Sequence, residues 1–252
     1  IHDMHHSMPR TAIGFLVRAL ACRKEQGIAP FTVVCCDNLP SNGDTTRTMV
    51  VTLAAQICSE LAHWIETHVA FPNSMVDRIV PRTTAADIEH IGRQSGMDDA
   101  WPVVTERFSQ WVLQDCFSGP RPCWEDAGVT LVKDVMPYEH AKLRMLNGSH
   151  STLAYLGGLI GYATVSEAIG DAQLSRFISE MLGEEVESTL TRPGLDSYRQ
   201  ELLTRFRNPA LKHRLQQIAM DGSQKVPQRL LGALRQRLAD GRPCPRICFA
   251  LA

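Results

Sequence analysis

A short apolar run near the start of the chain most constrains the fold. Residues 31–36 read Phe-Thr-Val-Val-Cys-Cys, between helical patterns over residues 11–27 and about 44–68. A continuous run of this kind is typical of a strand that is buried on both faces of a parallel sheet. Helix, buried strand, polar loop and helix therefore predict an α/β fold for the first part of the chain.

Two polar residues, Asp37 and Asn38, follow this run directly. Ligands of open α/β sheets bind beyond the carboxyl ends of the strands, so Asn38 is a candidate binding residue. The alternative is that Asp37 and Asn38 only turn the chain or cap the next helix.

The second half of the chain has a different pattern. Helical spacing recurs from residue 151 to residue 238, interrupted by Gly or Pro, and no strand pattern stands out. We therefore expect an all-α domain packed against the α/β part. The charges of the helix that starts near Asp196 are expected at its solvated surface.

Composition excludes several classes of protein. The chain has 252 residues, 44% of them hydrophobic, and a net charge of −1. This balance gives no electrostatic case for binding nucleic acid or an anionic membrane. No apolar run reaches the ~18 residues of a membrane span. The eight cysteines lack zinc-site spacing and are expected to be free thiols in a reducing cytoplasm. The first residue, Ile1, and the apolar last residues suggest an internal piece of a longer protein.

The segment from Met136 to His150 is the main candidate for chemistry. Pro137 and an acidic first turn predict that a helix begins here. At ~100° per residue, Lys142, Asn147 and His150 lie on one side of that helix. An amine, an amide and an imidazole would then share one patch, although such residues also form ordinary solvated faces.

Two further features favour a chemical site in this helix. Glu139 lies one turn before Lys142, and leucines lie on the same face as the amine. We also expect Gly148 and Ser149 to interrupt the helix, where another backbone or a ligand can come close.

Two charged clusters lie outside this helix. Asp77 and Arg78 have apolar neighbours, so they are expected to be partly buried and paired, as in a structural ion pair. Lys225 and Arg229 are four residues apart, and His213 lies upstream of them. A cationic cluster of this kind is ordinarily solvated surface.

The segment Lys142-Leu-Arg-Met-Leu-Asn-Gly-Ser-His-Ser151 resembles the catalytic segment of the polyol-specific long-chain dehydrogenases, the mannitol dehydrogenase and fructuronate reductase family. Val76-Asp-Arg-Ile79, followed by Pro81, resembles the signature of that family. Residues 217–230 are especially similar to its fructuronate reductase branch. The resemblance covers essentially the whole chain, but no glycine-rich dinucleotide fingerprint follows a strand.

The resemblance implies a fold, a reaction and a cofactor. Residues 1–135 would be the remainder of a Rossmann-like dinucleotide-binding domain, and residues 136–252 a truncated helical substrate domain. The reaction would be metal-independent hydride transfer between NAD(H) and a secondary alcohol or ketone of a sugar acid, fructuronate to D-mannonate.

The resemblance also implies roles for individual residues. Lys142 would be the acid and base, and Glu139 would relay protons to water. Asn38 and Asn147 would donate hydrogen bonds to the oxyanion, and His150 would orient a substrate hydroxyl. Asp77 would lie beside the nicotinamide together with Asn38. The substrate side would hold Lys225, Arg229 and His213, with a cation for a carboxylate.

Two alternatives remain at this point. One is a dehydrogenase of the same family that acts on mannitol or another polyol. The other is a helical interaction module without catalysis. The oligomeric state stays open.

Overall fold

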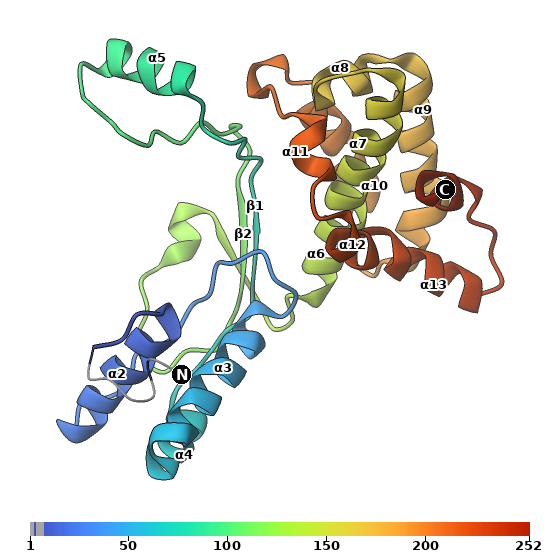
Figure 1. Ribbon diagram of the computed structural model, residues 1–252. Helices are drawn as coiled ribbons and strands as arrows, with labels where there is room; N and C mark the ends of the chain where they lie inside the picture. The colour runs from blue at the N-terminus through green and yellow to red at the C-terminus, as the bar shows by residue number, and fades with distance from the viewer. Residues whose placement is uncertain (1–2, 4–7) are drawn as a thin grey trace. The chain divides into compact units, whose positions relative to one another are not determined.

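The computed structural model describes Asp3 and residues 8–252. They form two compact units (Figure 1). Unit 1 comprises Ile1–Val76 and Gln110–Met136, and unit 2 comprises Asp77–Ser109 and Pro137–Ala252. The predicted order, a partial Rossmann-like α/β region followed by a helical domain, is confirmed, whereas the single boundary after residue 135 stays a prediction.

Three helices of unit 1 surround one apolar core: α2 (Ala12–Glu25), α3 (Asn42–Ile57) and α4 (Ser59–His68). The side chain of Thr11 caps α2 by accepting a hydrogen bond from the Gly14 N–H, as expected for a threonine at this position. The helix predicted over 44–68 is two helices, because Cys58 is extended with φ −158° and ψ 117°.

The strand predicted over residues 31–36 is wrong. These residues belong to no strand, and Cys36 is exposed rather than buried. The Val33 N–H donates to the Ala70 carbonyl at 3.0 Å. The Cys35 carbonyl accepts from side chains instead, from Asn42 Nδ2 at 2.9 Å and Ser74 Oγ at 2.6 Å. The apolar pattern identified a segment that packs into the core of unit 1, but side-chain hydrogen bonds to the Cys35 carbonyl take the place of a strand partner.

The sheet has three strands in the order β1 (Ser74–Asp77), β2 (Gln110–Gln114) and β3 (Val129–Val132). Strands β2 and β3 are parallel, with Trp111 opposite Val129. The short helix η1 (Trp124–Ala127) lies between β2 and β3 in the sequence.

Unit 2 begins with β1's last residue and α5 (Ala85–Ser95), whose start has a capping box between Thr84 and Asp87. The remaining elements of this unit are helical, as predicted. They are α6 (Met136–Ala141), η2 (Lys142–Asn147), α7 (Gly148–Ile160), α8 (Val165–Gly170), α9 (Ala172–Glu180), η3 (Met181–Val186), η4 (Glu187–Thr189), α10 (Leu195–Phe206), η5 (Pro209–Leu211), α11 (Leu215–Ala219), α12 (Gly222–Val226), η6 (Pro227–Leu231), α13 (Gly232–Ala239) and α14 (Pro245–Leu251).

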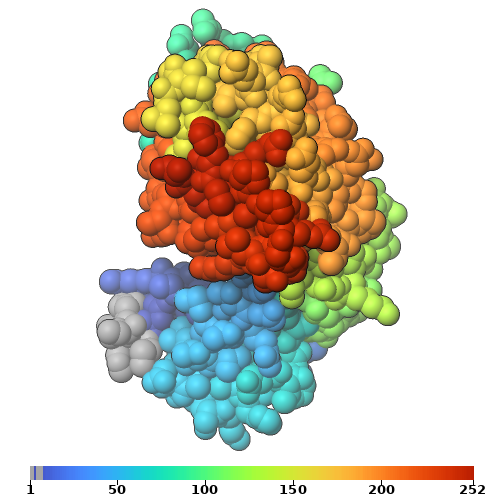
Figure 2. All heavy atoms as spheres, turned by 90° about the vertical axis from the view of Figure 1, so that its right-hand side faces the viewer, coloured from blue at the N-terminus to red at the C-terminus, as the bar shows by residue number. Residues whose placement is uncertain are grey.

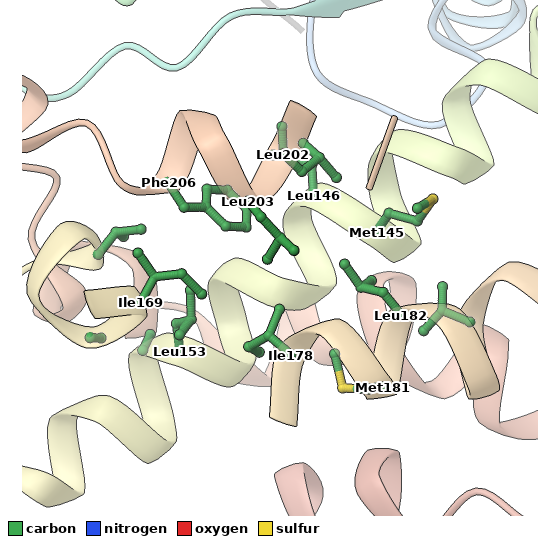
Figure 3. Packing of buried hydrophobic residues seen from close by; sticks show 14 of the residues in the cluster. Met145, Leu146, Leu153, Ile169, Ile178, Met181, Leu182, Leu202, Leu203 and Phe206 are labelled. Carbon is green, nitrogen blue, oxygen red and sulfur yellow. The ribbon is translucent and has the colours of Figure 1, made fainter. Parts of the chain in front are cut away.

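The core of unit 2 forms around α7, which packs against α8, α9 and α11. Leu153 of α7 and Ile178 of α9 lie near each other in this core (Figure 3), and both are fully buried, as is Leu202 of α10. Figure 2 shows the last residues of the chain, in red, over one face of unit 2, where α14 packs against η3 and α7. This packing holds α7 in place. The preceding segment η2 continues directly into α7 and is held with it.

Within the described part of the chain, no helix is long and apolar enough to cross a membrane.

Candidate active site

A π-helical turn lies at the start of the candidate site. The helices α6, η2 and α7 follow one another without a break, and η2, from Lys142 to Asn147, is π-helical. In a regular α-helix, residues five apart are separated by ~140° around the axis. A π turn has hydrogen bonds between residues five apart, so its first and last residues lie nearly one above the other. The π turn therefore brings Lys142 and Asn147 onto the same side of the helix.

The expected interruption at Gly148 and Ser149 is wrong, but the expected close approach is confirmed. Gly148 is helical, with φ −62° and ψ −48°. A Cβ atom at Gly148 would lie only 3.1 Å from the carbonyl oxygen of Arg229 and 3.4 Å from Cδ2 of Leu230. The missing side chain thus lets η6 lie directly against this helix, and η6 carries Arg229.

The polar residues of this helix are buried. Lys142 is 8% exposed, Asn147 8% and His150 4%. The alternative of a solvated polar face is therefore wrong for these three residues. Glu139 is also buried, one turn before Lys142.

Burial is the main cause of a lowered pKa at Lys142. Removal from water disfavours the ammonium form, and the positive charges of Arg229 and Arg205 act in the same direction. The carboxylates of Asp77 and Glu139 oppose this shift by attracting the ammonium group. Lys142 is thus more easily deprotonated than an ordinary lysine, as an acid–base group requires.

His150 lies between two other rings. Its ring centroid is 4.7 Å from that of Phe206 and 5.2 Å from that of His213, which it meets edge to face at 81°. Burial lowers the pKa of His150 well below its usual value, and the neighbouring His213 and Arg229 add to this. His150 is therefore neutral at pH 7, with one ring nitrogen as donor and the other as acceptor.

Three buried polar atoms of the helix lack a hydrogen-bond partner among the described protein residues. They are Oδ1 of Asn147, Oγ of Ser149 and Nε2 of His150. Buried polar atoms are normally hydrogen-bonded, and exceptions in native structures often mark functional groups. A small recess of about 10 Å³ also borders His150 and His213, with Arg205 and Asn208 in its lining.

The structure separates the three residues predicted to bind substrate. Nη1 of Arg229 donates to Ser151 Oγ at 3.1 Å, and its charge acts on Lys142, His150 and His213. Lys225 instead donates to the carbonyls of Met220 at 2.6 Å and Ile218 at 3.4 Å. Arg229 and His213 thus lie with the catalytic candidates, while the Lys225 ammonium is held by its own loop.

Asp77 was interpreted either as part of a structural ion pair or as a residue beside the nicotinamide. The structure shows the ion pair. Arg205 Nη2 donates to Asp77 Oδ1 at 2.8 Å and Nη1 donates to Oδ2 at 3.0 Å. Tyr198 Oη donates to Oδ2 at 3.0 Å. Burial predicted for the neighbouring Arg78 is wrong, because that side chain is exposed and donates to the Phe108 carbonyl.

Sequence reasoning missed Arg205 and Glu106. The charges of α10 were expected at the surface, yet Arg205 is buried and also pairs with Glu106 at 2.7 Å. One signal was available: Tyr198, Leu202 and Arg205 follow helical spacing, so the arginine continues an apolar stripe. Glu106 lies in an irregular segment that has no periodic pattern.

Asn38 belongs to unit 1, in the loop before α3, so its predicted convergence with the unit 2 residues stays a prediction. Its backbone N–H donates to Oδ1 of Asp37 at 2.8 Å. Neither residue caps α3, since Ser41 occupies the cap position. The alternative of a helix cap is therefore wrong, and the binding role of Asn38 stays a prediction.

Among the described residues, no three His, Cys, Asp or Glu side chains form a group that could hold a metal ion. The eight cysteines are free thiols.

Curated relatives are nearly 50% identical to this chain in sequence. The uncharacterized oxidoreductase YeiQ of Escherichia coli (strain K12) is 47% identical over 238 residues, which are 93% of this chain and 49% of the relative. D-mannonate oxidoreductase of the same organism is 45% identical over 255 residues, 100% of this chain and 52% of the relative. The chain spans about half the length of the curated relatives it matches.

A solved structure is also similar. The mannitol 2-dehydrogenase of Pseudomonas fluorescens, solved as a ternary complex with NAD and D-mannitol, superposes with a TM-score of 0.88 at 43% identity. The match covers 99% of this chain and 52% of that protein.

Two family profiles cover almost the whole chain. Residues 6–126 match the mannitol dehydrogenase Rossmann domain, and residues 134–252 match the mannitol dehydrogenase C-terminal domain. The buried lysine, asparagine and histidine lie in the second of these regions. With both domains matched and relatives above 40% identity, the chain belongs to the mannitol dehydrogenase family.

Proposed function

We propose that this chain serves an oxidoreductase that transfers a hydride between NAD(H) and a secondary alcohol or ketone of a sugar acid or polyol. The observation that carries the proposal is a buried lysine, Lys142, whose pKa is lowered by burial and which shares a buried helical segment with Asn147 and His150. A group of this kind matches the proton transfer that such a reaction needs near neutral pH.

Lys142 is assigned the proton transfer. In the reductive direction, hydride addition to the carbonyl carbon leaves an alkoxide, and the Lys142 ammonium gives it a proton at Nζ. In the oxidative direction the neutral amine removes the hydroxyl proton as the hydride leaves. The lowered pKa of Lys142 makes the neutral amine more accessible than in an ordinary lysine, as the oxidative direction requires. Because this assignment needs no metal, we infer that a chelator leaves turnover unchanged.

Asn147 and His150 are assigned to the substrate oxygen atoms. The amide of Asn147 would donate to the developing oxyanion together with Asn38, a contribution worth about 2.7–4 kcal/mol per donor in a preorganised site. The unpartnered ring nitrogen of neutral His150 would bind a substrate hydroxyl. Glu139, buried one turn before Lys142, would pass the proton on to water.

The cofactor is inferred from the fold and from the relative solved with NAD. When bound, nicotinamide donates or accepts the hydride. The buried amine, with the unpartnered Asn147 and His150 atoms in the same helical segment, fits the polar end of a reacting carbonyl. Asp77 contributes its charge rather than a direct contact, since both its oxygens accept hydrogen bonds from Arg205. Asn38 would act from the other unit.

We propose a sugar acid, fructuronate reduced to D-mannonate, as the substrate. Arg229 is a partly buried cation whose charge acts on both Lys142 and His150, so it is suited to a carboxylate at the other end of the substrate. The relative named D-mannonate oxidoreductase supports this choice. A polyol is the second candidate, favoured by the mannitol 2-dehydrogenase structure at 43% identity. The proposed location is the cytoplasm, where free thiols persist.

Comparing two substrates tests the choice. The complete protein and its Arg229→Ala variant are assayed with NADH on fructuronate and on fructose. We expect kcat/KM for fructuronate to fall about 10- to 100-fold more than for fructose, the range for a lost charge-assisted hydrogen bond. Lys225→Ala is the matched comparison and should leave the ratio unchanged. Equal losses on both substrates in Arg229→Ala would favour the polyol instead. No turnover on either substrate by the parent protein would leave the non-catalytic module as the explanation.

A further inference from the structure

We infer that Arg205 is a positioning residue that keeps the Asp77 carboxylate from acting as the full counter-ion of the Lys142 ammonium. The inference rests on the proposed acid–base role of Lys142. It adds α10, outside the helix that carries the proposed catalytic residues, to the set of elements that control the reaction.

The hydrogen bonds of Asp77 are the first observation. Arg205 donates to both carboxylate oxygens, at 2.8 and 3.0 Å, and Tyr198 adds a third hydrogen bond at 3.0 Å. Two parallel N–H bonds from one guanidinium fix a carboxylate in both position and orientation. Asp77 is therefore held by α10, and its negative charge is largely compensated there.

The second observation is the charge balance of the cluster. Arg205 also donates to Glu106, from Nε at 3.0 Å and from Nη2 at 2.7 Å, and its guanidinium lies 3.9 Å above the Phe108 ring. Glu106 in turn accepts from the Ile79 N–H at 2.6 Å. One buried cation thus serves two buried carboxylates, so the cluster carries one net negative charge.

The third observation is the set of charges that act on Lys142. Asp77 of β1 and Glu139 of α6 attract the ammonium, whereas Arg205 of α10 and Arg229 of η6 repel it. His150 of α7 is neutral at pH 7 because burial lowers its pKa.

η3 also packs against η2 and carries two acids. Both are bound elsewhere, since Glu184 and Glu185 accept hydrogen bonds from Arg246 at 2.8 and 3.4 Å. The charges that act on Lys142 are therefore those of Asp77, Glu139, Arg205 and Arg229, and Arg205 is the one that also binds Asp77.

Arg205 is a cation that repels the Lys142 ammonium and thereby offsets the attraction of Asp77. Removing its charge stabilises the ammonium form and raises the pKa of Lys142. The attraction of Asp77 would then offset more of the effect of burial.

The test is a double variant, Arg205→Gln with Glu106→Gln, compared with Glu106→Gln alone. The double variant removes one cation and one anion together and keeps polar groups that can hydrogen-bond in the buried cluster. Glu106→Gln keeps the Asp77–Arg205 pair, so it is the matched control. Arg205→Lys, which keeps the charge but not the two-pronged contact, is measured alongside in case the double variant does not fold.

Lys142 is titrated directly in the complete protein, by trace acetylation with acetic anhydride across pH and mass spectrometry of the peptide that contains it. We expect the midpoint of the double variant to rise by about one pH unit, a tenfold slower reaction at a fixed pH below the midpoint. Glu106→Gln should match the parent, and Arg205→Lys should show a smaller rise. Midpoints that stay at the parent value in the folded Arg205 variants would overturn the inference.

This readout does not require turnover. If the proposed function is wrong, Lys142→Met will be as active as the parent. If the inference is wrong, the titration midpoint of Lys142 will be the same in the Arg205 variants as in the parent. The two failures are therefore distinguishable. Where turnover is found, the pH profile of alcohol oxidation should shift upward in the double variant with the acetylation midpoint.

Discussion

Arg205 and Asp77 lie 128 residues apart in the sequence and form two hydrogen bonds of 3.0 and 2.8 Å in the interior of unit 2. The pair joins the last residue of β1 to α10. Buried ion pairs of this kind often contribute little net stability, but the loss of one partner leaves an uncompensated buried charge.

Replacing Arg205 by alanine should therefore destabilise the protein strongly. We expect a loss of about 3–5 kcal/mol in the free energy of unfolding, because Asp77 and Glu106 would remain buried without a cation. Urea unfolding followed by circular dichroism measures the change. Arg121→Ala is the control, since the exposed Arg121–Glu125 pair should contribute at most about 1 kcal/mol. Similar losses in the two variants would contradict the prediction.

Replacing Lys142 by methionine should remove catalysis without unfolding the chain. Methionine keeps an unbranched side chain in a buried position but cannot exchange a proton. We expect kcat to fall by about 100- to 10,000-fold, the usual contribution of a general acid or base. Steady-state kinetics of the complete protein give the result. The exposed Lys133, changed in the same way, should leave kcat within about twofold, within the small effect expected of a surface change.

The lowered pKa of Lys142 predicts the direction of the pH dependence. Alcohol oxidation requires the neutral amine, so its kcat should rise with pH along a limb whose midpoint lies below the ordinary lysine value of 10.5. Ketone reduction requires the ammonium form and should fall along the same limb. Initial rates in both directions between pH 6 and about 10.5 test this. An oxidation rate that is independent of pH across the range would assign the proton transfer to another group.

The buried His150 predicts lower stability in acid. Its folded-state pKa lies well below 6.5, so the unfolded chain binds a proton more readily. The stability that depends on neutral His150 is fully present above about pH 6.5 and is lost as the pH falls toward the folded-state pKa. The free energy of unfolding should change with pH by up to about 1.4 kcal/mol per pH unit, the value for one proton. Unfolding measured from pH 7.5 to 5 should show a smaller slope in His150→Gln than in the parent, and an equal slope would refute this prediction.

Two glycines of α7 should respond in opposite ways to alanine. A Cβ atom at Gly148 would lie 3.1 Å from the backbone oxygen of Arg229, so Gly148→Ala must displace η6 or strain the contact. Nothing lies within 4 Å of a Cβ at Gly158 in the same helix. We expect Gly158→Ala to be neutral or stabilising by up to about 1 kcal/mol and Gly148→Ala to be destabilising. Thermal unfolding compares the stability of the two variants. A Gly148→Ala variant more stable than the parent would show that η6 is free to move.

Local patterns predicted the helices and part of the site. Pro137 with Glu139 signals the start of the helix that carries Lys142. The apolar neighbours of Lys142 indicated that the amine is buried. These features depend on residues within one or two turns of each other, which a single sequence displays directly.

Features that depend on distant partners were not predictable in this way. The run at 31–36 has the composition of a buried strand, but strand formation depends on a neighbour, and Val33 bonds to a loop residue, Ala70. Arg205 was expected at the surface because its partners Asp77 and Glu106 lie about a hundred or more residues earlier in the sequence. The π turn at η2, which packs against η3 and η6, was also not predicted from the sequence.

That π turn determines where this helix can change in length. A π turn is a regular helix with one inserted residue. Deleting one residue between Lys142 and Asn147 would let ordinary α-helical bonding close across the gap. The two residues would then be four apart, ~40° around the axis, so their side chains would still share one side of the helix. Deleting a residue of α7 between Asn147 and His150, where the bonding is already α-helical, would instead rotate everything before it by ~100° and shift it by ~1.5 Å relative to everything after it. The spacing of the amide and the imidazole is therefore strict, whereas the π turn can absorb the loss of one residue.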